Sequence, residues 1–140
     1  MPLKGAKAHI GRLKNLDDIT RKEVGAALFA AADLIRVEAQ ISITRGAVSG
    51  KGHVVSKPGQ PPNADTHTLA NYINIEHRTV ALKATVRSDA EYSAPLEFGT
   101  SVMAARPFMR PARDKKKKDA QALVQQALNR ANKRSRSSDQ

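Results

Sequence analysis

A long helical pattern in the first third of the sequence most constrains the fold. Seven apolar residues fall near one helical face: Leu16, Ile19, Val24, Leu28, Ala31, Ile35 and Ala39. Asn15 is a suitable N-cap, and the aspartates Asp17 and Asp18 place negative charge where the helix dipole favours it. We expect a helix from Leu16 to Thr44, about 40 Å long at 1.5 Å per residue. Because that is long for a chain of 140 residues, one end should project and pack on something else.

Two short runs further along the chain alternate apolar and polar side chains. Residues 73–78 and 80–87 both show this period of two, which indicates half-buried strands. Only a few residues near Arg78 separate the runs, so we expect an antiparallel hairpin. A two-stranded sheet is marginally stable, so a third strand from residues 103–109 or from a neighbouring subunit would help.

The order of these patterns predicts an α+β fold, with a long N-terminal helix and a C-terminal helix packed on a small antiparallel β-sheet. Residues 15–132 are expected to form one domain, preceded by a mobile basic arm (1–14) and followed by a basic disordered tail (133–140). The Gly/Pro-rich residues 46–66 predict an extended loop, either disordered or ordered against a neighbouring subunit, with Pro58–Gly59 central to a type II turn.

The last helix is expected to begin at Pro111, since proline suits the first helical position. Residues 120–131 then repeat apolar side chains at helical spacing. Before it, residues 90–98 predict a short helix that Gly99 closes in a left-handed conformation.

Positive charge is concentrated towards the C-terminus of a chain whose formal net charge is +11. Residues 106–140 hold 11 basic and 3 acidic residues. Within them Lys115, Lys116, Lys117 and Lys118 should form a collar around the last helix, a possible polyanion contact that attracts phosphates without reading sequence. The partner is either nucleic acid or an acidic protein surface, and the alternative is a solvated segment that only aids solubility.

No motif for catalysis, cofactor binding or metal binding survives inspection. The chain has no cysteine, which excludes disulfides, thiolate zinc sites and cysteine nucleophiles. Residues 46–51 resemble a phosphate-binding loop, but one residue is missing between the glycines, and Gly52 replaces the Ser or Thr that holds magnesium. The four histidines lack metal-ligand spacing. Glu91 and Glu97 would lie on different sides of one short helix. We therefore expect no enzyme and no cofactor.

No segment is expected to enter a membrane. Residues 1–12 carry charges and no apolar run, unlike a secretory signal. No stretch approaches the roughly 18 apolar residues that a membrane helix needs.

Two motifs in this order resemble a family of phage tail-component proteins of the lambdoid type, found at the head–tail junction of long-tailed phages. The first is Ser56-Lys-Pro-Gly-Gln-Pro-Pro62, followed by Asp65, Thr66 and Leu69. The second has Tyr92, then Leu96-Glu97-Phe98-Gly99-Thr100, then Pro107-Phe108 and Pro111-Ala112. His67 departs from the family pattern, which has glycine at that position.

The resemblance implies a structural virion protein of the neck, assembled in the host cytoplasm as a tail-completion component. Tails of this type have six-fold symmetry, so a homohexameric ring is implied. Its neighbours would be the head stopper or connector, the tail terminator and the tail tube, with possible contact to packaged DNA. Alternatives are a tail terminator, a head-closure ring protein, or a nucleic-acid-binding module that uses the basic C-terminus. Because DNA must slide through a neck, docking on an acidic partner is favoured over tight DNA binding.

The second motif also supplies the residues expected at the subunit interface. They are Glu97, Phe98, Gly99, Thr100, Pro107, Phe108 and Pro111. The two phenylalanines would be anchors in the core or in the interface, and the prolines would set the path into the last helix. The alternative is that all of these residues serve packing within one chain.

Overall fold

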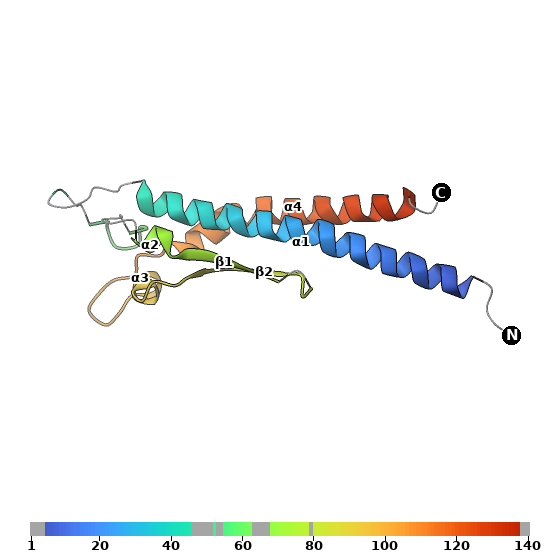
Figure 1. The fold of residues 1–140 in the computed structure, drawn as a ribbon. Helices are drawn as coiled ribbons and strands as arrows, with labels where there is room; N and C mark the ends of the chain where they lie inside the picture. Colours follow the sequence, from blue (N-terminus) through green and yellow to red (C-terminus); the bar gives the residue numbers. More distant parts are fainter. Residues whose placement is uncertain (1–4, 46–51, 53–54, 63–67, 79, 138–140) are drawn as a thin grey trace.

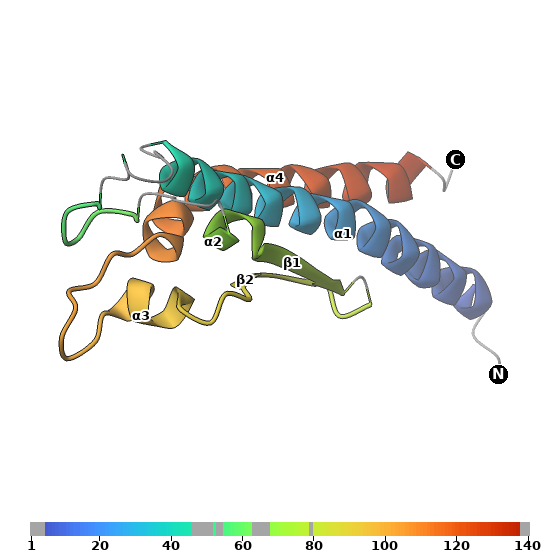
Figure 2. The same ribbon diagram turned by 60° about the vertical axis from the view of Figure 1, so that its left-hand side comes forward.

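The computed structural model describes residues 5–45, 52, 55–62, 68–78 and 80–137. Two long helices, α1 (Ala6–Thr44) and α4 (Met109–Ser137), lie side by side and antiparallel (Figure 1). The short helices α2 (Thr68–Asn71) and α3 (Ser93–Phe98) and a two-stranded sheet connect them. The predicted α+β fold is confirmed. Figures 1 and 2 show that α1 lies between α4 and the sheet, so α4 packs mainly on α1.

Helix α1 begins at Ala6, ten residues before the expected start at Leu16. The expected mobile arm is therefore wrong for residues 6–14, which are helical although their side chains are exposed. No proline interrupts this stretch, and adding residues to an existing helix costs much less than starting one. The expected end at Thr44 is confirmed.

Small side chains let α1 and α4 approach closely. The seven apolar residues of the α1 pattern are all buried or half-buried. On α4, Ala127 and Ala131 are almost inaccessible to solvent, as their helical spacing predicts. Most of the buried core is alanine, and the largest fully buried side chains are Phe108, Ile43 and Ile73. The core is thin, as the scarcity of aromatic residues predicts.

Ion pairs at two separate points define the antiparallel register of the helices. The Glu38 carboxylate accepts a hydrogen bond from Lys115 Nζ at 2.7 Å. Further along the pair, Glu23 contacts both Arg130 (3.5 Å) and Arg134. These contacts link the C-terminal half of α1 to the beginning of α4, and its middle to the end of α4.

The first turns of α1 extend beyond α4. Glu23 pairs with Arg130 and Arg134, which lie in the last turns of α4 before it ends at Ser137. The first turns of α1, well before Glu23, therefore have no part of α4 beside them (Figure 1). Ile10 and Leu13 lie on this free segment and are each 52% exposed. The expected projecting end of the long helix is therefore its N-terminal end.

The predicted hairpin is confirmed as β1 (Ile73–Arg78) and β2 (Lys83–Ser88). Strand β2 begins later than expected because Leu82 adopts a positive φ of 48° and still belongs to the turn. The sheet lies along α1, and the His77 ring contacts the Phe29 ring at 5.6 Å between centroids. Among the described residues no third strand pairs with it, and residues 103–108 instead lead into α4.

Both ends of α4 differ from expectation. The helix starts at Met109, so Pro111 is its third residue rather than its first. Proline is tolerated there because the first backbone N–H groups of a helix have no partner within it. At the other end residues 133–137 are helical, so the expected disordered tail is wrong for them. Residues 138–140 lie outside the described chain, as does most of the expected loop at 46–66.

Candidate functional site

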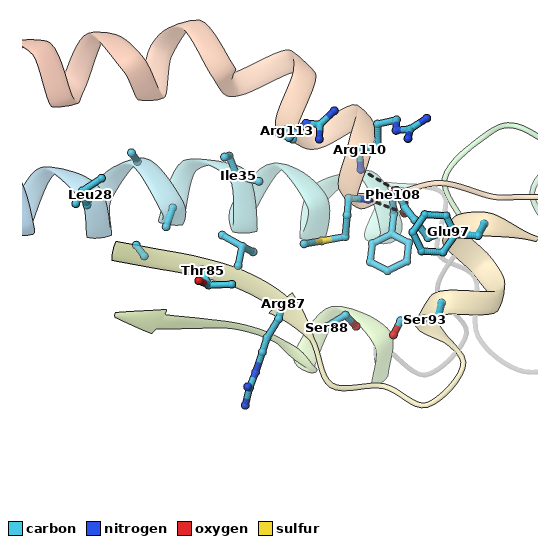
Figure 3. Close-up of a pocket in the computed structure, with 17 residues that line it drawn as sticks. Leu28, Ile35, Thr85, Arg87, Ser88, Ser93, Glu97, Phe108, Arg110 and Arg113 are labelled. Carbon is cyan, nitrogen blue, oxygen red and sulfur yellow. Dashed lines mark hydrogen bonds between the residues drawn. The ribbon is translucent and has the colours of Figure 1, made fainter. Parts of the chain in front are cut away.

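Glu97, at the end of α3, caps the N-terminus of α4. Its Oε2 accepts hydrogen bonds from the backbone N–H groups of Phe108 (2.8 Å) and Met109 (3.0 Å). Its Oε1 accepts one from the N–H of Arg110 at 2.9 Å (Figure 3). The next residue, Pro111, has no N–H to satisfy. One carboxylate therefore meets the free donors at the positive end of a long helix, and it holds α3 against α4.

Gly99 makes the sharp turn that places Glu97 there. Its φ of 76° and ψ of 175° differ from the expected left-handed helical conformation, and side chains disfavour this backbone region even more strongly. A Cβ atom at Gly99 would lie 2.9 Å from the backbone nitrogen of Ala105 and 3.0 Å from the carbonyl oxygen of Met103. Only glycine allows the two backbone segments to approach this closely.

The two motifs that are distant in sequence meet at this corner. The N–H of Gly59 donates to the carbonyl of Ala105 at 2.9 Å, and Arg106 Nε donates to the carbonyl of Ser56 at 3.2 Å. The type II turn predicted at Pro58–Gly59 is supported by the Gly59 φ of 84° and by the bond from Gln60 N–H to the Lys57 carbonyl. The α3–α4 corner is thus made by both motifs together.

The two phenylalanines of the second motif have opposite environments. Phe108 is 1% exposed and packs among core residues from α1, α2 and β1. Phe98 is 76% exposed, and Val102 in the following turn is 94% exposed. Phe108 is therefore a core residue, whereas Phe98 presents an aromatic ring to solvent on a well-braced corner.

A groove with a volume of about 690 Å³ lies beside this corner (Figure 3). Leu28 and Ile35 of α1 form one side, and β2, α3 and the first turn of α4 form the others. Phe98 lies at its edge, with Arg110 and Arg113 from α4. The lining is mostly apolar and includes three basic residues, Arg87, Arg110 and Arg113, which is the character of a binding surface.

The other expected interface residues lie in the α3–α4 connection. Thr100 is exposed, and its backbone N–H donates to the carbonyl of Met103 at 2.8 Å, which closes a tight turn. Pro107 is half-buried just before α4, and Pro111 is exposed in its first turn. These residues shape the corner within one chain, and none of the observed contacts tests their role between subunits.

The lysine run does not act as one collar. Lys115 is committed to Glu38, and this hydrogen bond lowers the pKa of the Glu38 carboxyl below its ordinary value of 4.5. Lys116 is half-buried, while Lys117 and Lys118 are exposed. Lys115 therefore stabilises the packing of α4 on α1. Any contact with a polyanion would be made mainly by the other three lysines of the run.

The described residues offer no chemical centre. No group of three or more His, Asp or Glu side chains within them is placed to hold a metal ion. The Glu97 carboxylate is occupied by three backbone donors, and Glu91 is exposed outside α3. Within the described part of the chain, no helix combines the length and apolar character needed to cross a membrane.

Sequence reasoning predicted a projecting end for this helix but missed that residues 6–14 are helical and form it. Its signal was the i, i+3 pair Ile10 and Leu13, which continues the apolar stripe that starts at Leu16. The basic residues around this pair were interpreted as an arm. The end of α4 was missed for the same reason, since a run of Lys, Arg and Ser resembles a disordered tail in composition.

Comparison with known proteins identifies the family. No curated protein and no solved structure matches the chain. A family profile described as "Bacteriophage HK97-gp10, putative tail-component" matches residues 7–99, well over half of the chain. The match contains the first motif and ends at Gly99, so Pro107, Phe108 and Pro111 lie beyond it. The chain belongs to the HK97-gp10-like family of bacteriophage tail components.

Proposed function

We propose that this tail component is a structural, non-enzymatic protein that completes the tail at the phage neck. It would form a homohexameric ring between the tail tube and terminator on one side and the head stopper or connector on the other. The virion would be its site of action, after assembly in the host cytoplasm. Family membership supports the tail role, and the ring is argued from the surface of the subunit.

The observation that carries the ring is the presence of two separate apolar surfaces that no described residue of the chain covers. One is the free segment of α1 with Ile10 and Leu13. The other is the α3–α4 corner, where Phe98 lines the groove and Val102 is exposed in the following turn. A contact that joins two different surfaces of identical subunits is heterologous, and it closes into a ring when its rotation allows. Exposed aromatic residues on rigid supports are typical anchors of such contacts.

The arrangement also supports a mechanical role rather than a chemical one. The Glu97 carboxylate and Gly99 hold the α3–α4 corner rigid from inside. The same corner displays Phe98 outwards. A rigid corner preserves the position of the anchor, which reduces the entropy lost when subunits associate.

Light scattering of the purified protein over a range of concentrations tests the ring. We expect a species with the mass of six 15.2 kDa chains. Phe98→Ser should shift the population towards monomer, because it removes the proposed anchor. Val80→Ser is the matched control, since Val80 is also exposed but lies at the hairpin turn, away from the groove.

Two outcomes would contradict the proposal. A wild-type protein that stays monomeric at every concentration would exclude a self-assembling ring, although its family membership would stand. A ring that persists in Phe98→Ser as it does in Val80→Ser would place the interface elsewhere.

A further inference from the structure

One face of α4, from Lys118 to the end of the helix, carries mainly polar hydrogen-bond donors and small side chains. Between Ala120 and Ser137 the helix has no acidic residue. The exposed polar side chains recur at steps of three and four residues, which places them on one face. We call this face the donor stripe, and it consists of Lys118, Gln121, Gln125, Asn129, Asn132, Lys133 and Arg136.

The donor stripe points away from the rest of the molecule. By helical rotation of 100° per residue it lies nearly opposite Ala127 and Ala131, which face α1. Gln125 Nε2 donates to Asn129 Oδ1 at 3.2 Å, which aligns two of its side chains along the helix. A shallow hollow of about 390 Å³ lies along its C-terminal part, lined by Asn129, Asn132, Lys133, Arg136 and the neighbouring Arg130.

The cations of the donor stripe differ from those beside it. Arg130 and Arg134 turn towards α1 and pair with Glu23. Lys118, Lys133 and Arg136 form no ion pair within the described part of the chain. Their charge is available to a partner, and the continuous helix fixes the spacing of the residues that carry it.

We propose that the donor stripe binds the phosphate backbone of double-stranded DNA, weakly and without reading its sequence. Lysine, arginine, asparagine and glutamine are the side chains that commonly contact phosphate oxygens. The stripe has no aromatic residue for base stacking and no large apolar anchor for a protein partner. From Lys118 to Arg136 it spans about 27 Å at 1.5 Å per residue, enough for several phosphates.

Weak, sequence-independent contacts suit DNA that passes a protein ring. Three cations without an ion pair in the described part of the chain would displace few counterions from the DNA, so the affinity is modest and falls as salt rises. This kind of binding lets DNA slide. It removes the objection that tight binding would hinder passage through a neck. The donor stripe goes beyond the proposed ring, because it assigns DNA contact to a helix face that the ring contacts do not use.

The test is the salt dependence of binding to a labelled random-sequence DNA duplex of about 30 base pairs, followed by fluorescence anisotropy. The variant is the full-length double mutant Lys133→Gln/Arg136→Gln. Its matched control is Lys57→Gln/Lys83→Gln, which removes the same charge from two exposed lysines without ion pairs in the described chain. Thermal unfolding followed by circular dichroism verifies that both variants are folded.

We expect the stripe variant to lose about tenfold or more in affinity at low salt, and its log–log salt slope to fall by about 1.8. The control should lose less than about twofold, since its lysines are remote from the donor stripe. Equal losses in both variants would overturn the proposal and leave only attraction by net charge. Binding of labelled poly-glutamate with the same affinity and the same loss would also overturn it, in favour of an acidic protein. Light scattering of the same samples reports separately on the ring.

Discussion

At the scale of single residues, the second motif is mainly a device for folding one chain. Glu97 caps α4, Gly99 permits the close approach of two backbone segments, and Phe108 fills the core. Phe98 alone among these four points its side chain to solvent. Three residues of a motif that was expected at an interface therefore stabilise the α3–α4 corner within one chain. Only Phe98, the fourth, is exposed on its surface.

Replacement of Glu97 should measure the strength of the cap. Glu97→Ala leaves three backbone donors without their acceptor, so we expect a loss of about 2 kcal/mol in the free energy of unfolding. Glu97→Gln keeps one acceptor oxygen and should lose less. Denaturant unfolding gives both values. Glu91→Ala serves as control, and its exposed side chain should change stability by less than about 0.5 kcal/mol. Equal effects of the two alanine variants would refute the cap.

Two glycines should respond to alanine in opposite directions. Gly99→Ala places a Cβ atom against the backbone of Ala105 at positive φ, and we expect a loss of about 2 kcal/mol or more in unfolding free energy. Gly11 lies inside α1 with open space around it, so Gly11→Ala should gain up to about 1 kcal/mol. Thermal melts of both variants check the signs. A gain from Gly99→Ala would show that the corner relaxes easily.

At the scale of elements, the helix pair depends on close packing and on charge at two points. Alanine at the contact surface buries little area per residue, so each additional contribution matters more. The Glu38–Lys115 and Glu23–Arg130 pairs tie the ends of α4 to α1. The two ion pairs also specify the register of α1 against α4. Alanine side chains alone would allow one helix to shift along the other by a turn.

The Glu38 pair predicts a pH dependence of stability. The pKa of Glu38 is lowered in the folded protein, chiefly by the hydrogen bond from Lys115. Its contribution is therefore present above the ordinary pKa of 4.5, and it is lost as pH falls through the lower folded value. Solvent around the half-exposed Lys115 limits the contribution to about 1 kcal/mol or less.

Comparison of wild type with Glu38→Gln isolates this contribution. Near neutral pH the variant should be less stable, and the difference should shrink towards zero as the solution is acidified below about pH 4. Urea unfolding at a series of pH values measures it. A difference that is the same at every pH would mean that the pair does not stabilise the folded state through its charge.

At the scale of the whole molecule, the beginning of α1 and the end of α4 lie at the same end of the helix pair (Figure 1). There the overhang of α1 presents Ile10 and Leu13, and the end of α4 presents part of the donor stripe. Helix α3, whose last residue is Phe98, lies near the other end of the helix pair (Figure 2). A subunit with unlike surfaces at its two ends is suited to head-to-tail association.

Removal of residues 1–13 should separate folding from assembly. The deleted side chains that the structure describes are exposed, so the unfolding free energy should change by less than about 1 kcal/mol. Asn15 would then be available as an N-cap, with Asp17 in the first turn. Light scattering should show loss of the ring. Ile43→Ala, within the packed part of α1 and away from the groove, is the control that should lower stability by about 2 kcal/mol or more. An intact ring after the deletion would exclude the overhang as an interface.

The sequence by itself determined the type and order of the main elements. Three patterns indicate which face of an element is buried: the helical repeat before Thr44, the alternation at residues 73–78 and the repeat at residues 120–131. The spacing of apolar residues gives this information even when the element that covers the face is unknown. The Pro58–Gly59 turn and the need for glycine at position 99 were also readable, because both depend on local backbone conformation.

Only the tertiary structure decided where α1 begins, where α4 begins and ends, and which motif residues face outwards. Glu97 lies more than ten residues before the backbone N–H groups that it caps. No local sequence pattern therefore predicts these hydrogen bonds. Phe98 and Phe108 have the same side chain, and their burial depends on the path between them. The charged ends of α1 and α4 resemble disordered tails in composition, yet they continue helices that are anchored elsewhere, because extending an existing helix is far easier than nucleating a new one.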